Sequence, residues 1–460
     1  MRFTYLLCLL FLGSFLAIGC GDDDGAADAS NPDAQADGAA DAAGDANVPD
    51  ATPDARPDAN AGCTEGCEFV EVVGGFAHSC ARRANGEVRC WGSNVDRELG
   101  DGLARHPGAN CMNAGDIEDV DCADPVTVSM LDDATQISSH GGPSTCALRE
   151  GGSVVCWGLQ SVSRAAGSDT LPRRERPEPL MGFDSISDIS DGFNHTCGVG
   201  GTNALCIWRN DAGQLGNGDT LEQRSPQTVI GVTNVADVEV SNGEFSCAID
   251  MAGAVFCWGS NRNFELGDGM THETCTDSST GTDFDCVFEA VPVTLENGET
   301  ATSLALGRRH ACALTNAQNV QCWGENAVGQ LGLDDTMARP TPTTIASLSG
   351  ITELVAGSRH TCVIDGTGQA WCWGDNEQDT VGVESGGQNC TSGGNTADCV
   401  LAPVQVTGLS DATALGAGSR HTCAIRMTGD IACWGWNDRR QLGDGTRMAR
   451  ATPVMVRQLE

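Results

Sequence analysis

Residues 418–446 read GSRHTCAIRMTGDIACWGWNDRRQLGDGT, and this stretch decides the fold because the chain repeats it. Aligned on its first cysteine, the unit occurs at Cys80, Cys146, Cys197, Cys247, Cys312, Cys362 and Cys423. Successive copies are 66, 51, 50, 65, 50 and 61 residues apart. A base period of about 50 residues with three longer units is typical of propeller blades or of a solenoid.

Each unit contains short apolar and β-branched runs, such as residues 361–364, that are separated by Gly and Asn. Such runs predict β-strands, and no stretch keeps a helical period over three turns. Five residues before the first cysteine, six units have Gly and one has Asn242. We expect a backbone turn at positive φ there, because Gly and Asn tolerate that conformation best. The sequence therefore predicts an all-β fold.

Two further features mark the units. A Trp-Gly pair follows the second cysteine at Trp91, Trp157, Trp258, Trp323, Trp373 and Trp434, and a Gln-Leu-Gly turn follows at Gln214, Gln330 and Gln441. With the cysteine pattern, these features resemble the repeat of the regulator of chromosome condensation family from about residue 68 to 460. The resemblance implies a seven-bladed β-propeller. Two units depart, one with Arg164-Ala165-Ala166 in place of the turn and one with Ile207-Trp208 in place of Trp-Gly, and we expect irregular blades there.

The ends of the repeat region suggest how the ring closes. Interior units open with a Pro-Val-x-Val strand, as in residues 125–128 and 403–406, but the first unit begins without one at residues 68–73. The chain ends with a spare copy at residues 453–456. We expect this C-terminal strand to complete the blade begun at the N-terminus, which would hide two sheet edges.

The cysteines predict a disulfide within each unit. In the first unit a three-residue turn at residues 84–86 would set Cys80 opposite Cys90, and in the shortest unit a two-residue turn at residues 201–202 would set Cys197 opposite Cys206. Opposite residues without mutual hydrogen bonds are about 4.5 Å apart at Cα, which a disulfide can bridge. Every cysteine after Cys20 has a local partner, as expected of an exported protein. The pairs are Cys63 and Cys67, Cys80 and Cys90, Cys111 and Cys122, Cys146 and Cys156, Cys197 and Cys206, Cys247 and Cys257, Cys275 and Cys286, Cys312 and Cys322, Cys362 and Cys372, Cys390 and Cys399, and Cys423 and Cys433.

A His-x-Cys pattern recurs in five units, at His78, His195, His310, His360 and His421. Thiolate and imidazole together suit zinc. The other two units carry Ser144 and Phe245 at this position, and phenylalanine cannot bind a metal. We therefore interpret the histidine as structural, hydrogen-bonded within its own blade, and predict neither a metal site nor a cofactor.

The three long units each carry an insert bounded by cysteines, NCMNAGDIEDVDC at 110–122, TCTDSSTGTDFDC at 274–286 and NCTSGGNTADC at 389–399. All three fall between the Leu-Gly turn and the Pro-Val strand, so they would emerge from equivalent loops on one rim. We hypothesise that this rim binds a ligand; the alternative is a tolerated insertion without one. The candidate residues are Asn113, Asp116, Asp119, Asp121, Asp277, Asp283, Asp285, Asn395 and Asp398. Their carboxylates would suit calcium, but no EF-hand spacing is present.

The N-terminus resembles a bacterial lipoprotein leader. A short apolar run ends at Ala17-Ile18-Gly19-Cys20, which predicts a signal peptide over 1–20 and acylation of Cys20. Ala17 stands where a lipobox usually has Leu, and simple cleavage with release is the alternative. Residues 21–62 contain eleven Asp and one Arg with few large apolar residues, so we predict a disordered linker before a propeller over 63–460.

The net charge of −37 should repel nucleic acid and anionic head groups. The sequence contains no nucleophile elbow, no phosphate loop and no Ser/His constellation apart from the repeat. We therefore predict a monomeric, non-enzymatic binding module at the cell envelope, in the outer membrane, at the surface or in the periplasm, with a protein, peptide or glycan as its unknown partner. The alternatives are an enzyme with a site at the channel, or a secreted inhibitor of another protein such as a β-lactamase, which the resemblance implies.

Overall fold

The computed structural model describes residues 66–103, 111–113, 120–159, 173–277, 280–384, 388–392 and 395–459. Those between 66 and 391 and between 396 and 459 belong to one compact unit. The predicted signal peptide, Cys20, the linker, Cys63, Asp116 and Asp119 lie outside the described residues. No helix in the described part of the chain is long and apolar enough to span a membrane.

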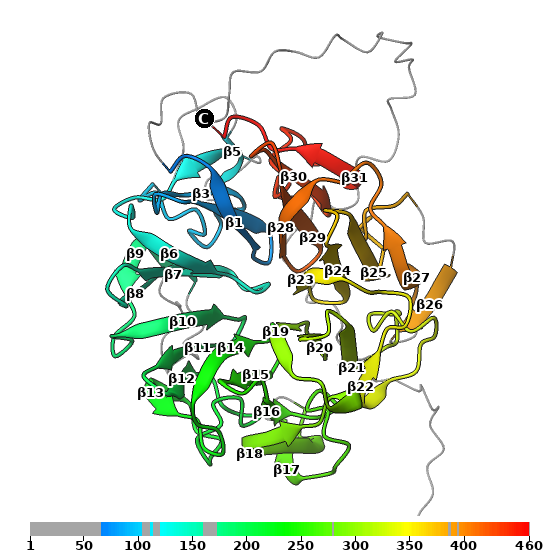
Figure 1. Ribbon diagram of the computed structural model, residues 1–460. Coiled ribbons are helices and arrows are strands. Elements are labelled where there is room, and N and C mark those ends of the chain that lie inside the picture. The colour runs from blue at the N-terminus through cyan, green and yellow to red at the C-terminus, as the bar shows by residue number, and fades with distance from the viewer. Residues whose placement is uncertain are drawn as a thin grey trace, which may run out of the picture. The chain divides into compact units, whose positions relative to one another are not determined.

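Seven antiparallel sheets follow one another around a central axis in the described residues (Figure 1). Each sheet is one blade, and its first four strands from the axis outward follow one another in chain order, apart from the inserted edge strands β4, β17 and β26. Blades 1, 4 and 6 have a fifth strand at the outer edge. The fold is therefore the predicted all-β, seven-bladed propeller.

The strands of blades 1 to 3 have the following bounds. Blade 1 contains β1 (Phe69–Gly74), β2 (His78–Arg83), β3 (Val88–Gly92), β5 (Val120–Thr127) and β4 (Cys111–Asn113). Blade 2 contains β6 (Ala134–Ser138), β7 (Ser144–Arg149), β8 (Val154–Leu159) and β9 (Arg173–Pro179). Blade 3 contains β10 (Ile186–Asp191), β11 (His195–Gly200), β12 (Asn203–Trp208) and β13 (Gln223–Thr228).

The strands of blades 4 to 7 complete the ring. Blade 4 contains β14 (Val235–Val240), β15 (Phe245–Asp250), β16 (Val255–Ser260), β18 (Asp283–Val293) and β17 (Glu273–Thr276), and a 3-10 turn, η1 (Glu296–Gly298), follows it. Blade 5 contains β19 (Ala301–Leu306), β20 (His310–Thr315), β21 (Val320–Gly324) and β22 (Arg339–Thr344). Blade 6 contains β23 (Ile351–Ala356), β24 (His360–Asp365), β25 (Ala370–Asp375), β27 (Asn395–Gln405) and β26 (Gln388–Ser392), and blade 7 contains β28 (Ala412–Ala417), β29 (His421–Arg426), β30 (Ile431–Gly435) and β31 (Arg450–Met455).

The cysteine hairpins have the predicted register. Cys80 lies opposite Cys90, and in blade 3 the shorter turn keeps Cys197 opposite Cys206. Seven such cross-strand disulfides are present, with Cα atoms 4.0 to 4.2 Å apart. Two more close the inserts, from Cys275 to Cys286 and from Cys390 to Cys399. Cys67 and Cys122 are also disulfide-bonded.

The reason why glycine stands five residues before the first cysteine differs from the one predicted. Among the seven positions only Gly141 has a positive φ. At Gly75 a Cβ atom would lie 2.0 Å from Cε1 of His78, so the histidine ring leaves no space for a side chain. The expectation of a positive-φ turn at all seven positions is therefore wrong, because close packing and not backbone conformation selects glycine.

Positive φ falls instead on the glycine of the Trp-Gly pair. Six blades have glycine there, with φ between 87° and 109°. In blade 3 this place is taken by Trp208, whose φ is 91°, a conformation that costs a bulky residue about 1–3 kcal/mol. The predicted irregularity of blade 3 is thus a strained residue within a complete sheet.

No sheet in the described residues combines strands from the two ends of the chain, so the ring closes without a shared blade. The last strand, β31, pairs with β30 of its own repeat, where Val454 lies opposite Cys433. Pro125 and Val126 belong to β5, the fourth strand of blade 1. The prediction that the C-terminal strand completes the first blade is therefore wrong. Each Pro-Val strand is the outer strand of the preceding unit, because a short connection favours pairing with the strand that comes just before it.

Side-chain packing joins blade 7 to blade 1. Phe69, Val72 and Trp91 of blade 1 share a core with Ile431 and Leu442 of blade 7. The buried Arg83 donates hydrogen bonds to the carbonyl oxygens of Cys67 (2.9 Å) and Leu459 (2.6 Å). This guanidinium therefore holds both ends of the described chain against one strand.

One hydrogen bond recurs at six of the seven seams between blades. The indole nitrogen of the Trp-Gly tryptophan donates to a carbonyl oxygen in the Leu-Gly turn of the preceding blade, at 2.8 to 3.1 Å. Trp91 reaches Gln441 in this way across the closure, and Trp157 reaches Glu98. The seventh seam lies between blades 2 and 3, the two units that depart from the repeat.

Candidate interaction face

Seven short loops join each inner strand to the second strand, and all lie at the same end of the axis because the blades repeat one strand order. We call them the mouth loops: residues 75–77, 139–143, 192–194, 241–244, 307–309, 357–359 and 418–420. The connections from the third to the fourth strand, with their inserts, emerge at this end too. We call this side of the propeller the loop face.

Hydrogen bonds between neighbouring mouth loops make a rigid rim around the axis. The amide of Arg308 donates to the carbonyl of Ser358 (3.0 Å), that of Ser358 to Ser419 (3.2 Å), and that of Ser419 to Gly75 (3.1 Å). Asn242 bonds across the axis to the hydroxyl of Ser358. The side chains that the mouth loops display are therefore held in fixed positions.

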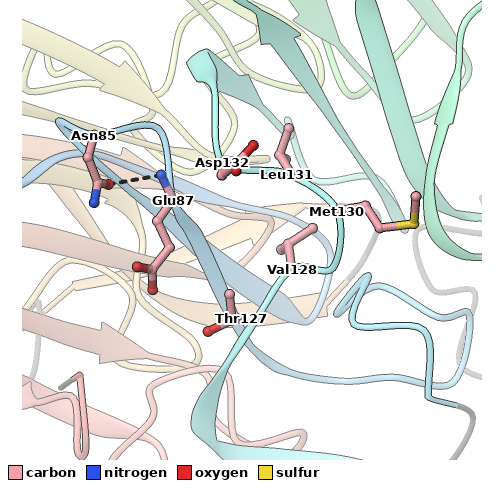
Figure 2. A pocket seen from close by; sticks show the side chains of 7 residues that line it. All are labelled: Asn85, Glu87, Thr127, Val128, Met130, Leu131 and Asp132. Atoms are coloured by element: carbon pink, nitrogen blue, oxygen red, sulfur yellow. Dashed lines mark hydrogen bonds between the residues drawn. The ribbon is translucent and has the colours of Figure 1, made fainter. Parts of the chain in front are cut away.

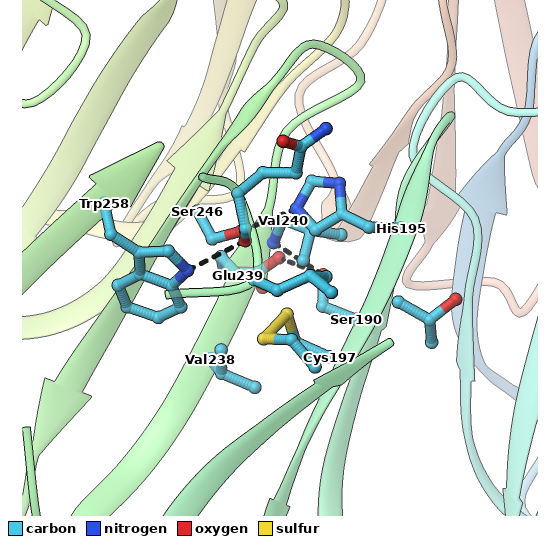
Figure 3. The surroundings of a disulfide bond; sticks show 12 residues. Ser190, His195, Cys197, Val238, Glu239, Val240, Ser246 and Trp258 are labelled. Atoms are coloured by element: carbon cyan, nitrogen blue, oxygen red, sulfur yellow. Dashed lines mark hydrogen bonds between the residues drawn. A yellow bond between two sulfur atoms is a disulfide. The ribbon is translucent and has the colours of Figure 1, made fainter. Parts of the chain in front are cut away.

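The recurring histidine bonds to the next blade, so the prediction of a partner within its own blade is wrong. His360 Nε2 lies 2.8 Å from the hydroxyl of Thr422, and His195 Nε2 lies 2.6 Å from that of Ser246 (Figure 3). Burial lowers the pKa of His195 and His360 to about 3, so both rings are neutral at pH 7. Within the described residues no three His, Cys, Asp or Glu side chains are placed to hold a metal ion.

The three inserts form hairpins at the outer edges of blades 1, 4 and 6, as Figure 1 shows for β17 with β18 and for β26 with β27. Their equivalent place in the blades agrees with the sequence analysis. No two of these blades are neighbours in the ring, so the hairpins do not form one continuous surface. A partner that contacts all three would have to span the loop face.

Most of the candidate insert residues whose side chains are described are bound by the protein itself. Asp121 is almost fully buried and pairs with Arg447 (2.6 Å). Asp285 and Asp398 each accept a hydrogen bond at 2.7 Å, from the amides of Asn261 and Asn376 respectively. The carboxylates of Asp285 and Asp398 therefore fix the turn before their inserts. For Asn113 and Asn395 the structure describes the backbone only, in β4 and β27.

The second insert is tied to the mouth by ion pairs. Arg262 lies 3.1 Å from Asp277 of the insert and 3.7 Å from Glu244 of a mouth loop. Its guanidinium also lies over the ring of Phe284, 3.3 Å from the centroid. Asp283 is exposed and accepts a hydrogen bond from Thr276 across the hairpin (2.8 Å). The insert of blade 4 is therefore continuous with the mouth.

An arginine and aromatic cluster at the mouth is the feature that the sequence analysis missed. Arg420 is exposed, and Phe76 (45 % exposed) packs edge-on against Trp436, with ring centroids 5.9 Å apart. Arginine precedes the histidine also at Arg309 and Arg359. The signal for this cluster in the sequence is the Arg-His pair that three successive units share.

The channel contains carboxylates that serve the ring. Glu71, Asp188 and Glu353 on inner strands accept hydrogen bonds from backbone amides of the next blade, at 2.8 to 3.2 Å. Burial raises the pKa of Glu353 to about 7, and burial with the nearby Asp188 raises that of Asp237 to about 7. Because these acids recur as links between blades, they have a structural use.

One channel cluster is specific to blades 2 to 4. Ser190 donates to Glu239 (2.8 Å) and accepts from the amide of Val240 (3.0 Å), while His140 Nδ1 lies 3.8 Å from Glu239 (Figure 3 shows Ser190 and Glu239). The serine is therefore not hydrogen-bonded to the histidine. This arrangement lacks the serine-to-histidine contact that activates a nucleophile.

The opposite face has an open hollow of about 340 Å³ between blades 1 and 2 (Figure 2). Asn85, Glu87, Val128, Met130 and Asp132 are among the residues that line it. Glu87 is paired with Arg89 at 2.7 Å, and Asn85 accepts a hydrogen bond from the Glu87 amide (3.0 Å). The hollow is shallow and its polar groups do not converge on a point.

The chain matches the model of the regulator of chromosome condensation (RCC1) repeat at residues 69–97, 301–330, 351–379 and 412–441, and a second model of the same repeat at 252–314, 319–364 and 367–425. It is 28 % identical to the ultraviolet-B receptor UVR8 of Arabidopsis thaliana over 339 residues, 70 % of this chain and 69 % of the relative. It is also 28 % identical to the human E3 ubiquitin-protein ligase HERC2, which it covers over only 5 % of that protein's length and 59 % of its own.

Solved structures share the fold. Human WBSCR16 superposes with a TM-score of 0.64 at 15 % identity, covering 80 % of this chain and 94 % of that one. Yeast RCC1 (Prp20), solved bound to Kap60, superposes with a TM-score of 0.63 at 19 % identity, covering 81 % and 83 %.

Proposed function

Because this chain is a seven-bladed β-propeller built of repeats of the regulator of chromosome condensation type, we propose that it acts as a non-enzymatic protein-binding module. The binding surface is the loop face. One observation carries the proposal: this face holds exposed charged and aromatic side chains on loops that are joined to one another by hydrogen bonds. A rigid scaffold that presents such side chains binds a partner with little loss of conformational entropy.

The relatives support a protein partner over a glycan or a small molecule. UVR8 is named as a receptor, and yeast RCC1 has been solved in a complex with Kap60. Within the described residues the channel carboxylates link blades, and the serine and histidine near Glu239 do not contact each other. Both observations favour binding over catalysis.

We further propose that the propeller is exported and anchored at the cell envelope through an acylated Cys20, with residues 21–62 as the tether. The nine disulfides of the described residues are typical of a protein that folds in an oxidising compartment. Metabolic labelling with a palmitate analogue should mark the chain, and Cys20→Ser should abolish both the label and membrane retention. A labelled Cys20→Ser chain would disprove the anchor.

The binding face can be tested by photo-crosslinking in the producing cells. A benzoylphenylalanine placed at Phe76 or Phe193, which are 45 % and 41 % exposed on the loop face, should yield a discrete protein adduct. The same residue placed at Met181 or Met427, which are exposed on the opposite side, is the control. Equal adducts from both faces, or none from the loop face, would refute the assignment.

A further inference from the structure

An exposed cation and two aromatic rings lie together where blade 7 meets blade 1. Arg420 forms no ion pair and no side-chain hydrogen bond with the described residues. The amide of Trp436 bonds to the Arg420 carbonyl (2.9 Å), and Phe76 packs against the Trp436 ring. Arginine, tryptophan and other aromatic residues are the types most enriched at the energetic centres of protein interfaces.

More arginines extend this cluster along the mouth. Arg308 and Arg309 lie on the mouth loop of blade 5, Arg359 on that of blade 6 and Arg420 on that of blade 7. The backbone hydrogen bonds from Arg308 to Ser358 and from Ser358 to Ser419 hold these three loops side by side. Arg359 and Arg420 line one small hollow together with Asp375 and Glu377. We define Arg309, Arg359, Arg420, Trp436 and Phe76 as the arginine patch.

Two arginines of the patch have long ion pairs within the protein. Arg309 lies 3.7 Å from Glu325 and Arg359 lies 3.6 Å from Asp375, and the two arginine side chains are 33 % and 24 % exposed. Ion pairs at such distances in partly exposed positions stabilise a fold by less than about 1 kcal/mol. The ion pair of Arg359 with Asp375 therefore opposes pairing with an external carboxylate only weakly.

The patch gathers arginines in a molecule whose total net charge is −37. At physiological salt, charges more than about 8 Å away are largely screened, so a local group of guanidinium forks governs what binds beside it. Such forks pair with carboxylates through two parallel hydrogen bonds. The flanking indole and phenyl rings supply apolar area next to the cations.

We propose that the arginine patch binds an acidic peptide segment of the partner protein. This inference rests on the proposed function, since it names the chemistry that the loop face recognises. The segment would place successive carboxylates over Arg359 and Arg420 and cover the Trp436 and Phe76 rings.

A fluorescein-labelled peptide of twelve glutamates is the probe, with fluorescence anisotropy of the full mature chain as the readout. A molecule of charge −37 without such a site should repel this peptide, so saturable binding that weakens with salt is the expected result. Arg420→Glu and Trp436→Ala should each weaken it at least tenfold. The matched control is Arg224→Glu, the same charge reversal at a 63 % exposed side chain of β13 in blade 3, and it should leave binding unchanged.

Three results would overturn the inference. These are no binding of the glutamate peptide, an equal loss in Arg224→Glu, or a concentration-dependent dimer in sedimentation that Arg420→Glu dissociates, which would assign the patch to a second copy. Unchanged thermal melting of each variant separates loss of the patch from loss of the fold. If the crosslinks from Phe76 and Phe193 persist while the peptide fails to bind, the interaction face stands and only its acidic partner is wrong.

Discussion

The histidine that begins the second strand of five blades is one half of a pair whose other half lies in the next blade. Where the histidine is absent, the partner has changed as well. Phe245 of blade 4 shares a core with Ala311 of blade 5, at the place where other blades have Thr or Ser. Ser144 of blade 2 donates to Asp191 of blade 3 (2.7 Å). The seam between blades 4 and 5 is therefore matched as a pair of residues, whereas blade 3 keeps Thr196, which also donates to Asp191 (2.6 Å).

This matching predicts the result of a paired substitution at the seam between blades 5 and 6. Thr361→Ala removes the hydroxyl that lies 2.9 Å from His310 Nε2, and a buried nitrogen left without a partner should lower the free energy of unfolding by about 1–3 kcal/mol. The double variant His310→Phe with Thr361→Ala copies the natural pair Phe245 and Ala311 and should recover most of that loss. Urea unfolding measures both, and Thr367→Ala at an exposed turn is the control. A double variant less stable than the single one would contradict the pairing.

The buried histidines also predict how stability depends on pH. Burial lowers the pKa of His78, His195, His310 and His360 to about 3 and that of His421 to about 4. Since the unfolded chain binds these protons near pH 6.5 and the folded chain does not, stability should fall as pH drops from about 6.5 towards 3, by up to about 1.4 kcal/mol per unit for each histidine.

Buried carboxyl groups act in the opposite direction. Burial raises the pKa of Glu98 to about 8, those of Glu265, Glu353 and Asp237 to about 7, and that of Asp191 to about 6. Because the folded chain keeps these protons, the stability that these groups contribute falls as pH rises from about 4 through those values. Melting temperatures recorded from pH 4 to 9 should therefore be highest at mildly acidic pH. The double variant at positions 310 and 361 removes one buried histidine, so its stability should fall less steeply than that of the natural chain as pH drops from 6.5 to 4, by up to about 1.4 kcal/mol per pH unit. Parallel pH profiles of the natural chain and the double variant between pH 6.5 and 4 would contradict this account.

At the scale of elements, the two irregular units belong to the same seam. The tryptophan of each blade donates to the turn of the blade before it, so the donor at the seam between blades 2 and 3 would come from blade 3 and the acceptor from blade 2. Blade 3 has Ile207 where the donor would stand, and the sequence of blade 2 has Arg164-Ala165-Ala166 where the turn would stand. The two departures from the repeat are separate in the sequence, but both affect the same tryptophan-to-turn hydrogen bond between blades 2 and 3.

The regular seams predict which tryptophans matter for stability. Trp373 is fully buried and donates to the carbonyl of Gln330 (2.9 Å). Trp373→Ala should lower the free energy of unfolding by about 3–5 kcal/mol through the lost area and the cavity. Trp371 lies on the same strand but is partly exposed and donates to Asp365, so Trp371→Ala is a matched control with a smaller loss. Similar losses in chemical denaturation would show that the seam contact carries no special weight.

Contacts inside one repeat could be predicted, and contacts between repeats could not. The strands, the hairpin register of Cys80 with Cys90 and the number of blades follow from a pattern that is complete within about 50 residues. The partner of His360 is 62 residues away, so a single copy gives no sign of it. The prediction places the Pro-Val strand in the wrong unit because nothing in the repeated sequence marks where one unit ends and the next begins.

The candidate site shows the same division. The sequence predicts Asp285 and Asp398 as ligand-binding because it gives no sign of their asparagine partners, Asn261 and Asn376, which precede them by 24 and 22 residues. The arginine patch was overlooked because its members come from different blades and only the ring brings them together. The amino-acid composition does not predict a cluster of arginines on the surface, because the chain as a whole is strongly acidic.

At the scale of the whole molecule, the ring is closed by side chains and by one buried guanidinium. Arg83 is 2 % exposed and bonds to carbonyls near both ends of the described chain. Arg83→Ala should lower the free energy of unfolding by about 2–4 kcal/mol, since bonds from a charged donor are strong and two carbonyls lose their partner. Deleting residues 457–460 should cost a similar amount, and the two changes together should cost less than their sum.

Arg149→Ala is the control for this prediction, because Arg149 pairs with Asp133 at the surface with both side chains about a third exposed. It should change stability by less than about 1 kcal/mol. Strict additivity of Arg83→Ala with the deletion would show that the arginine does not act through the C-terminal residues.

Each blade is formed by one continuous segment of the chain, and this affects how its disulfide forms during export. In each of the nine described disulfides, no other cysteine lies between the two bonded cysteines in the sequence. An oxidant that acts on thiols in the order in which they emerge during vectorial transfer would therefore make the native pairs without any later isomerisation. Each blade could fold and be oxidised before the next one arrives, leaving only the final seam to await the end of synthesis.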